Sequence, residues 1–100
     1  MKYMVTWKID QDKWLPVLIT WTSMSPAQRT DVGSSVRLIG RWHNLAARKG
    51  VLILDSDDLA GVQKYIGKWN PYMDTAVVPV FDDEESIPVC QSILDNSKSD

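Results

Sequence analysis

The feature that most constrains the fold is the order in which strand-like and helix-like apolar patterns follow one another. Alternation of apolar and polar residues, or a short continuous apolar run, is typical of strands, whereas apolar residues at spacings of three and four indicate amphipathic helices. The predicted strands are 3–9, 36–43, 51–54 and 75–81, and the predicted long helices are 13–24 and 58–69. The resulting order, β-α-β-β-α-β, predicts an α+β ferredoxin-like fold, with an antiparallel sheet of four strands and both helices on one face.

Local signals mark where helices begin and end. Ser25, followed by a proline and then by Gln28, is the pattern of a capping box, so a short helical turn is expected over 26–31. Asn70-Pro71 ends the second long helix, because a proline disfavours helical geometry in the residue before it.

The C-terminal part of the chain has weaker patterns. Pro79 within the last strand predicts an edge position or a bulge, since proline cannot donate to a neighbouring strand. We expect a single domain over 1–85 and a C-terminal extension over 86–100. The extension is predicted to form one or two helical turns over 87–94 and to be disordered over 96–100.

Both faces of the predicted sheet carry apolar side chains. One face of the first strand holds Tyr3, Val5, Trp7 and Ile9, and one face of the second holds Val36, Leu38, Gly40 and Trp42. Strict alternation then places Arg41 and His43 on the opposite face of the second strand, together with Ile39. The helices cover one face of the sheet only. A second copy of the sheet is therefore expected to cover the other, which predicts a homodimer.

Composition narrows the possible partners. A formal net charge of −2 supplies no basic field for nucleic acid or an anionic membrane. No apolar stretch approaches the roughly 20 residues of a membrane span, and the N-terminal residues lack the apolar core of a signal peptide. The single cysteine, Cys90, forms no internal disulfide. We therefore expect a cytoplasmic protein with neither a nucleic-acid nor a membrane partner.

Five tryptophans in 100 residues point to an aromatic-lined pocket or a subunit interface. Trp7 and Trp42 are expected to form an aromatic wall of a ligand pocket, with packing in the core as the alternative. Trp14, Trp21 and Trp69 lie on the helical stripes and are assigned to the core or to an interface.

The candidate site is the segment Gly40-Arg41-Trp42-His43, which ends the second predicted strand. His43 is the only histidine and the candidate catalytic base, the alternative being a hydrogen-bonded histidine at a strand end. Arg41 is expected either to bind a carboxylate or enolate with its planar guanidinium or to pair with the acidic tail of its own or a partner subunit.

Asn70 and Tyr72 are further candidates for ligand binding, at the mouth of the pocket, unless Asn70 serves only the turn that follows the helix. One histidine and one cysteine in the tail do not make a zinc site. We therefore predict no metal site and no cofactor.

Several short motifs resemble those of a known family. They are M-V-T-W at 4–7, G-R-W-H at 40–43, W-N at 69–70 and P-V-x-D-D-E-E at 79–85, together with the acidic start of the second long helix. Over 1–85 the chain resembles a bacterial family of short proteins, a domain of unknown function (DUF3303), in the dimeric α/β-barrel superfamily. The resemblance implies a homodimer whose two sheets face each other as a barrel, with ligands between the sheet and the helices of each subunit. It implies no catalytic residues, because so varied a superfamily transfers a fold and not a reaction.

Three functions remain open. The leading hypothesis is a homodimeric protein that binds a small aromatic or otherwise apolar molecule in an aromatic-lined pocket. The second is a cofactor-independent monooxygenase or isomerase-like enzyme with His43 as its base. The third is a stress or interaction protein whose barrel serves only dimerisation, and a solid interior without a pocket would favour it.

Overall fold

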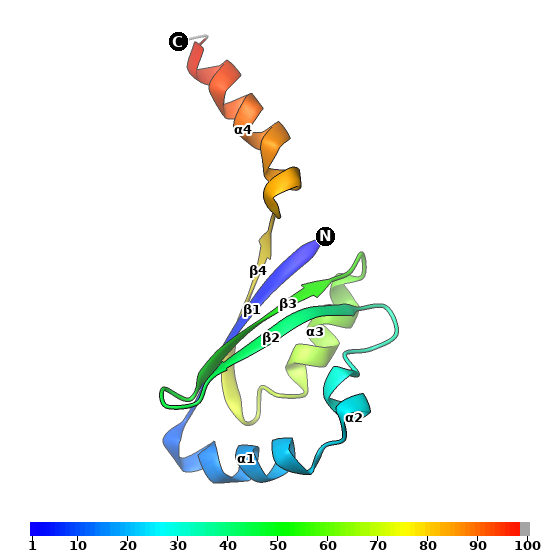
Figure 1. Cartoon of the computed structure of the whole chain (residues 1–100), viewed down its shortest axis with the longest axis vertical. Helices are drawn as coiled ribbons and strands as arrows, with labels where there is room; N and C mark the ends of the chain where they lie inside the picture. Colours follow the sequence, from blue (N-terminus) through cyan, green and yellow to red (C-terminus); the bar gives the residue numbers. More distant parts are fainter. Residues whose placement is uncertain (99–100) are drawn as a thin grey trace.

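The computed structural model describes residues 1–98, and its elements follow the predicted β-α-β-β-α-β order before a last helix (Figure 1). The strands are β1 (Lys2–Ile9), β2 (Arg37–Asn44), β3 (Lys49–Asp55) and β4 (Met73–Val80). The helices are α1 (Trp14–Ser23), which follows a short 3₁₀ turn η1 (Gln11–Lys13), then α2 (Pro26–Thr30), α3 (Leu59–Gly67) and α4 (Asp83–Lys98). The α+β class predicted from the sequence is confirmed.

The four strands form one antiparallel sheet in the order β2-β3-β1-β4. The strands β1 and β3 are therefore central, and β2 and β4 are the edges. Pro79 lies in the edge strand β4, the first of its two predicted positions, and pairs with Tyr3 of β1.

The core lies between one face of this sheet and the helices. Its buried apolar side chains are Tyr3, Val5, Val32, Val36, Leu52, Leu54, Val62 and Ile66. Val62 and Ile66 lie four residues apart and thus on one side of α3, which faces the strands. Leu54 and Val62 have no exposed surface at all. The helices therefore cover the sheet face on which the alternating apolar residues of β1 and β3 lie.

The faces of β2 differ from those predicted by strict alternation. The pairing of β2 with β3 shifts by one residue between Leu38 and Gly40, which is a β-bulge. An extra residue reverses the alternation of all side chains beyond it. Arg41 and His43 therefore face the helices, whereas Trp42 faces the opposite side of the sheet. The predicted assignment of these three side chains to faces is wrong for this reason.

The short helix α2 begins as its sequence predicts. The backbone N–H of Gln28 donates to the hydroxyl of Ser25 (3.2 Å), and the backbone N–H of Ser25 donates to the side-chain oxygen of Gln28 (2.8 Å). This capping box satisfies two N–H groups that a helix start otherwise leaves without partners.

The last helix is longer than predicted. It runs without interruption over Asp83–Lys98, where one or two turns and then disorder from residue 96 are expected from the sequence. Residues 99 and 100 of that expectation lie outside the described residues. The helix projects away from the sheet, at the far end of β4 (Figure 1). Its side chains are almost all exposed, among them Ile87, Ile93 and Leu94.

A second capping box starts α4. The backbone N–H of Glu85 donates to the Asp82 carboxylate (2.8 Å), and the backbone N–H of Asp82 donates to Glu85 (3.1 Å). The ammonium of Lys2 contacts both carboxylates, at 3.0 and 3.1 Å. These contacts connect the start of α4 to the start of β1, which is the point at which the helix leaves the sheet.

Candidate functional site

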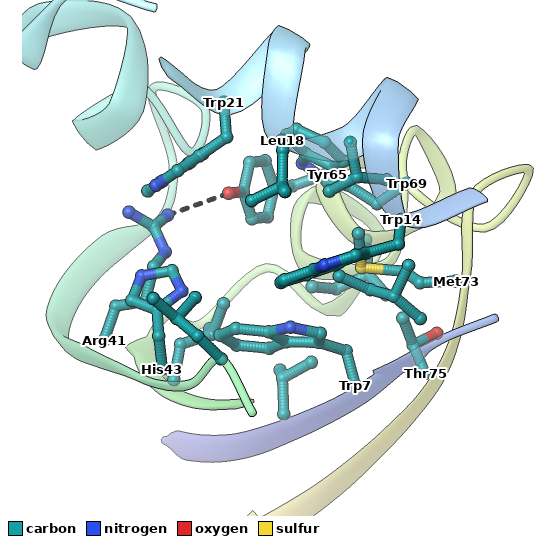
Figure 2. A pocket seen from close by; sticks show the side chains of 16 residues that line it. Trp7, Trp14, Leu18, Trp21, Arg41, His43, Tyr65, Trp69, Met73 and Thr75 are labelled. Atoms are coloured by element: carbon teal, nitrogen blue, oxygen red, sulfur yellow. Dashed lines mark hydrogen bonds between the residues drawn. The ribbon is translucent and has the colours of Figure 1, made fainter. Parts of the chain in front are cut away.

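A cavity of about 80 Å³ lies between the sheet and helices α1 and α3 (Figure 2). Four of the five tryptophans line it, namely Trp7, Trp14, Trp21 and Trp69. An apolar cavity of about 150 Å³ accepts benzene, so this one encloses at most part of a single-ring molecule, with the remainder at the mouth.

The helical part of the wall follows from residue spacing. Trp14, Leu18 and Trp21 lie at intervals of four and three on α1, so they share one face, and that face points at the sheet. Tyr65 on α3 and Trp69, just beyond its end, lie four apart and face the same cavity. From the sequence, the three helical tryptophans are assigned to the core or an interface. Their shared stripe is a signal for a wall, but spacing alone does not distinguish a filled interior from a hollow one.

The floor of the cavity is the ring of Trp7. This residue pairs with Gly50 of the adjacent strand β3, and its indole lies directly over the glycine. A β-carbon at position 50 would overlap the ring. Glycine therefore permits a close approach of the indole to the backbone, which a larger residue would prevent.

Polar groups gather at one end of the cavity, around Arg41. Its guanidinium donates to the hydroxyl of Tyr65 (3.0 Å) and to the backbone carbonyl of Arg29 (2.9 Å), and it lies 4.8 Å from the ring centre of Trp21 (Figure 2). No carboxylate within residues 1–98 forms an ion pair with it. The predicted pairing with the acidic tail of the same chain is wrong, because Lys2 holds the two carboxylates at the start of α4.

His43 lies at the mouth of the same cavity, exposed on one side. Its ring centre is 5.5 Å from that of Trp7 and 5.3 Å from that of Trp21. Partial burial among these rings, and secondly the positive charge of Arg41, lower the pKa of His43 below its ordinary 6.5. The imidazole is therefore neutral at pH 7 and retains one nitrogen that accepts a proton.

Trp42 does not line the cavity. It lies on the other face of the sheet, packs over Gly40 and is 58% exposed. The predicted aromatic wall of Trp7 and Trp42 is therefore wrong. The cavity has a tryptophan wall nonetheless, but helices α1 and α3 supply the partners of Trp7.

Asn70 and Tyr72 stand behind the cavity wall. The side-chain oxygen of Asn70 accepts a hydrogen bond from the hydroxyl of Thr75 (2.7 Å), and Thr75 lines the cavity. The ring of Tyr72 meets the edge of Trp69, with ring centres 6.4 Å apart, and is 45% exposed. Both residues therefore support wall residues without lining the cavity themselves, whereas Trp7, Arg41 and His43 of the predicted set all line it.

Residues 1–98 contain no group of three or more His, Cys, Asp or Glu side chains placed to hold a metal ion. Over the same residues no helix combines the length and apolar character that a membrane crossing requires.

The chain was compared with known proteins. A family model described as a domain of unknown function (DUF3303) matches residues 1–94. The match extends nine residues beyond the 1–85 over which the motifs resemble that family, and it includes most of α4. No curated protein matches the chain.

Proposed function

The chain belongs to the family of the domain of unknown function DUF3303, and we propose its function from the geometry of the cavity. The protein binds a small aromatic molecule between its sheet and its helices. The ring of the ligand lies among the four cavity tryptophans, and its polar substituent lies beside Arg41 and His43.

The observation that carries this proposal is the convergence of four indole rings on one open cavity. Aromatic side chains normally close such a space by packing against each other, as large rings fill cores well. Here they leave about 80 Å³ open, next to a cluster of polar groups. An apolar pocket with a few convergent polar groups is the usual form of a small-molecule site. The open interior also speaks against a fold that serves dimerisation alone.

Nuclear magnetic resonance of the five indole N–H groups tests the proposal, with phenol as the probe. We expect phenol to shift the signals of the cavity tryptophans and to leave that of Trp42 unchanged, because Trp42 lies on the other face. The fifth indole is thus an internal control for unspecific effects. Equal shifts of all five signals, or no shift of any, would refute a ligand site in the cavity.

We also propose that two chains pair through the outer face of the sheet, as a ferredoxin-like fold does when it forms a dimeric α/β barrel. This face carries the apolar side chains Met4, Trp42, Val51, Ile53 and Val78, which no helix covers. Trp42 and Val78 are 58% and 45% exposed in the single chain. Apolar patches of this kind mark protein interfaces more often than free surfaces.

Light scattering at micromolar concentration tests the pairing and is expected to give twice the mass of the chain. Trp42→Glu places a charge in the proposed interface and should yield monomers. Ile19→Glu is the matched control, because Ile19 is equally apolar and 68% exposed but lies on α1, away from the outer face. A monomeric wild-type protein would contradict the proposal.

A second candidate function is general-base catalysis by His43 on the bound ligand, as in a cofactor-independent monooxygenase or an isomerase. The observation in its favour is the position of a neutral imidazole at the cavity mouth, where its free nitrogen can accept a proton from a bound molecule. Each molecule that shifts the cavity indoles is then followed by chromatography for conversion. We expect His43→Gln to abolish conversion while binding persists, and unchanged conversion would remove His43 from the chemistry.

A further inference from the structure

The polar end of the cavity is rich in hydrogen-bond donors. Arg41 carries five N–H groups, and the two protein acceptors it meets, on Tyr65 and Arg29, engage two of them. The hydroxyl of Tyr65 accepts from Arg41, so its own proton remains available, and it has no acceptor among residues 1–98. Neutral His43 adds one further N–H at the mouth.

The positive charge at this end is not compensated. No aspartate or glutamate is among the sixteen residues that line the cavity. The guanidinium of Arg29 lies on the same tryptophan as that of Arg41, with its central carbon 5.9 Å from the ring centre of Trp21. Neither arginine forms an ion pair within the described part of the chain, although Arg37 on the same strand does. The guanidinium of Arg41 thus stands at one end of an apolar cavity without a counter-charge, and that of Arg29 adds a second positive charge on Trp21, a wall residue.

From this arrangement we infer that the ligand of the cavity is an anion: a single aromatic ring bearing a carboxylate or another anionic oxygen, held by Arg41 and the hydroxyl of Tyr65. The inference rests on the proposed function and names its ligand class. The planar guanidinium matches a carboxylate in geometry, and hydrogen bonds between charged groups are about twice as strong as neutral ones. The rings of Trp7 and Trp14 provide the apolar part of the site.

Benzoate and benzamide are a suitable pair of probes, because they share a ring and nearly the same shape but differ in charge. Their affinities are measured from the shifts of the cavity indole signals at low ionic strength. We expect benzoate to bind roughly 10- to 100-fold more tightly, the range that one charge-assisted hydrogen-bond pair contributes. The preference should decrease as salt is added, since the mouth is open to solvent.

Two variants separate the charge of the site from the charge of the protein. Arg41→Met is expected to remove the preference for benzoate. Arg37→Met changes the net charge equally, but Arg37 pairs with Asp55 outside the cavity, so the preference should persist. If Arg41→Met fails to fold, Tyr65→Phe retains the ring, removes the hydroxyl and should weaken benzoate more than benzamide.

The outcomes distinguish this inference from the function on which it rests. Equal affinity for the two probes, or tighter binding of benzamide, overturns the anionic ligand and leaves a neutral-ligand site standing. A preference that survives in Arg41→Met overturns the role of Arg41. Absence of any cavity shift with benzoate, benzamide and phenol overturns both proposals.

Discussion

The contact between Trp7 and Gly50 permits a quantitative test of how the cavity floor is built. Substitution of Gly50 by alanine places a β-carbon inside the indole of Trp7, so the ring must leave its position on the sheet. The other walls of the cavity surround this ring and restrict where it can go. Gly40→Ala is the matched control. Trp42 covers Gly40 in the same way but is 58% exposed, so its ring can move into solvent.

The expected magnitude follows from comparing the two variants. Overpacking of an enclosed site costs about 1–3 kcal/mol of unfolding free energy. Replacing a strand glycine by alanine returns about 0.5–1 kcal/mol through the entropy of the unfolded chain, and this gain is common to both positions. Gly40→Ala is therefore expected to be neutral or slightly stabilising. Gly50→Ala should be less stable than Gly40→Ala by about 1–3 kcal/mol, because the common gain cancels.

Urea unfolding followed by circular dichroism measures this difference, and the indole signals report the movement of the ring. In Gly50→Ala the signal of Trp7 should shift and phenol should bind more weakly, whereas Gly40→Ala should alter only the signal of Trp42. Equal stability of the two variants, or unchanged phenol binding in Gly50→Ala, would show that Trp7 is not a confined part of the floor.

Three further predictions concern the site, the last helix and the core. The pKa of His43, measured by NMR, should lie below 6.5 and should rise in Arg41→Met, which removes one of its two causes. In the wild-type protein the folded state binds this proton more weakly than the unfolded state. His43 therefore contributes stability above pH 6.5, and this stability is lost as the pH falls from 6.5 to the folded pKa. Asp82→Ala removes a capping box and an ion pair, so amide exchange in the first turn of α4 should accelerate. Asp83→Ala should change this exchange less, because the Asp83 carboxylate makes neither contact. The backbone N–H of Glu85, and secondly Lys2, hold the pKa of Asp82 below 3.8. These contacts are lost as the pH falls through that lowered value, so acid should have the same effect as Asp82→Ala. Leu54→Ala should destabilise the fold by about 2–5 kcal/mol in urea unfolding, as Leu54 is fully buried, and a loss below 1 kcal/mol would contradict its place in the core.

The order of the elements is predictable from sequence because apolar periodicity directly records which side of each element is buried. The directions of the β2 side chains cannot be predicted in this way, since one bulge moves every later side chain of the strand to the opposite face of the sheet. Gly40 offers a signal for this bulge, as glycine within a strand often marks one, but the position of the extra residue depends on the pairing with β3. The sequence therefore identifies Arg41 and His43 as site residues and places them on the wrong side of the sheet.

The helical tryptophans show a second limit. Their spacing predicts that they face inward, and they do, but whether inward-facing rings fill the interior depends on the distances between α1, α3 and the sheet. Those distances are set by the whole packing and not by any local pattern. The start of α4 is, by contrast, open to prediction, because Asp82 and Glu85 have the spacing of a capping box, but this signal does not give the length of the helix.

The projecting α4 makes the chain longer than its number of residues suggests. The Cα radius of gyration of the chain is 16.8 Å and its longest dimension is 56 Å, whereas a compact domain of about 100 residues has a radius of gyration near 13 Å. Small-angle X-ray scattering therefore responds directly to the orientation of this helix. A tail of large interatomic distances indicates a helix that extends into water, and its disappearance indicates that the helix has folded back against protein.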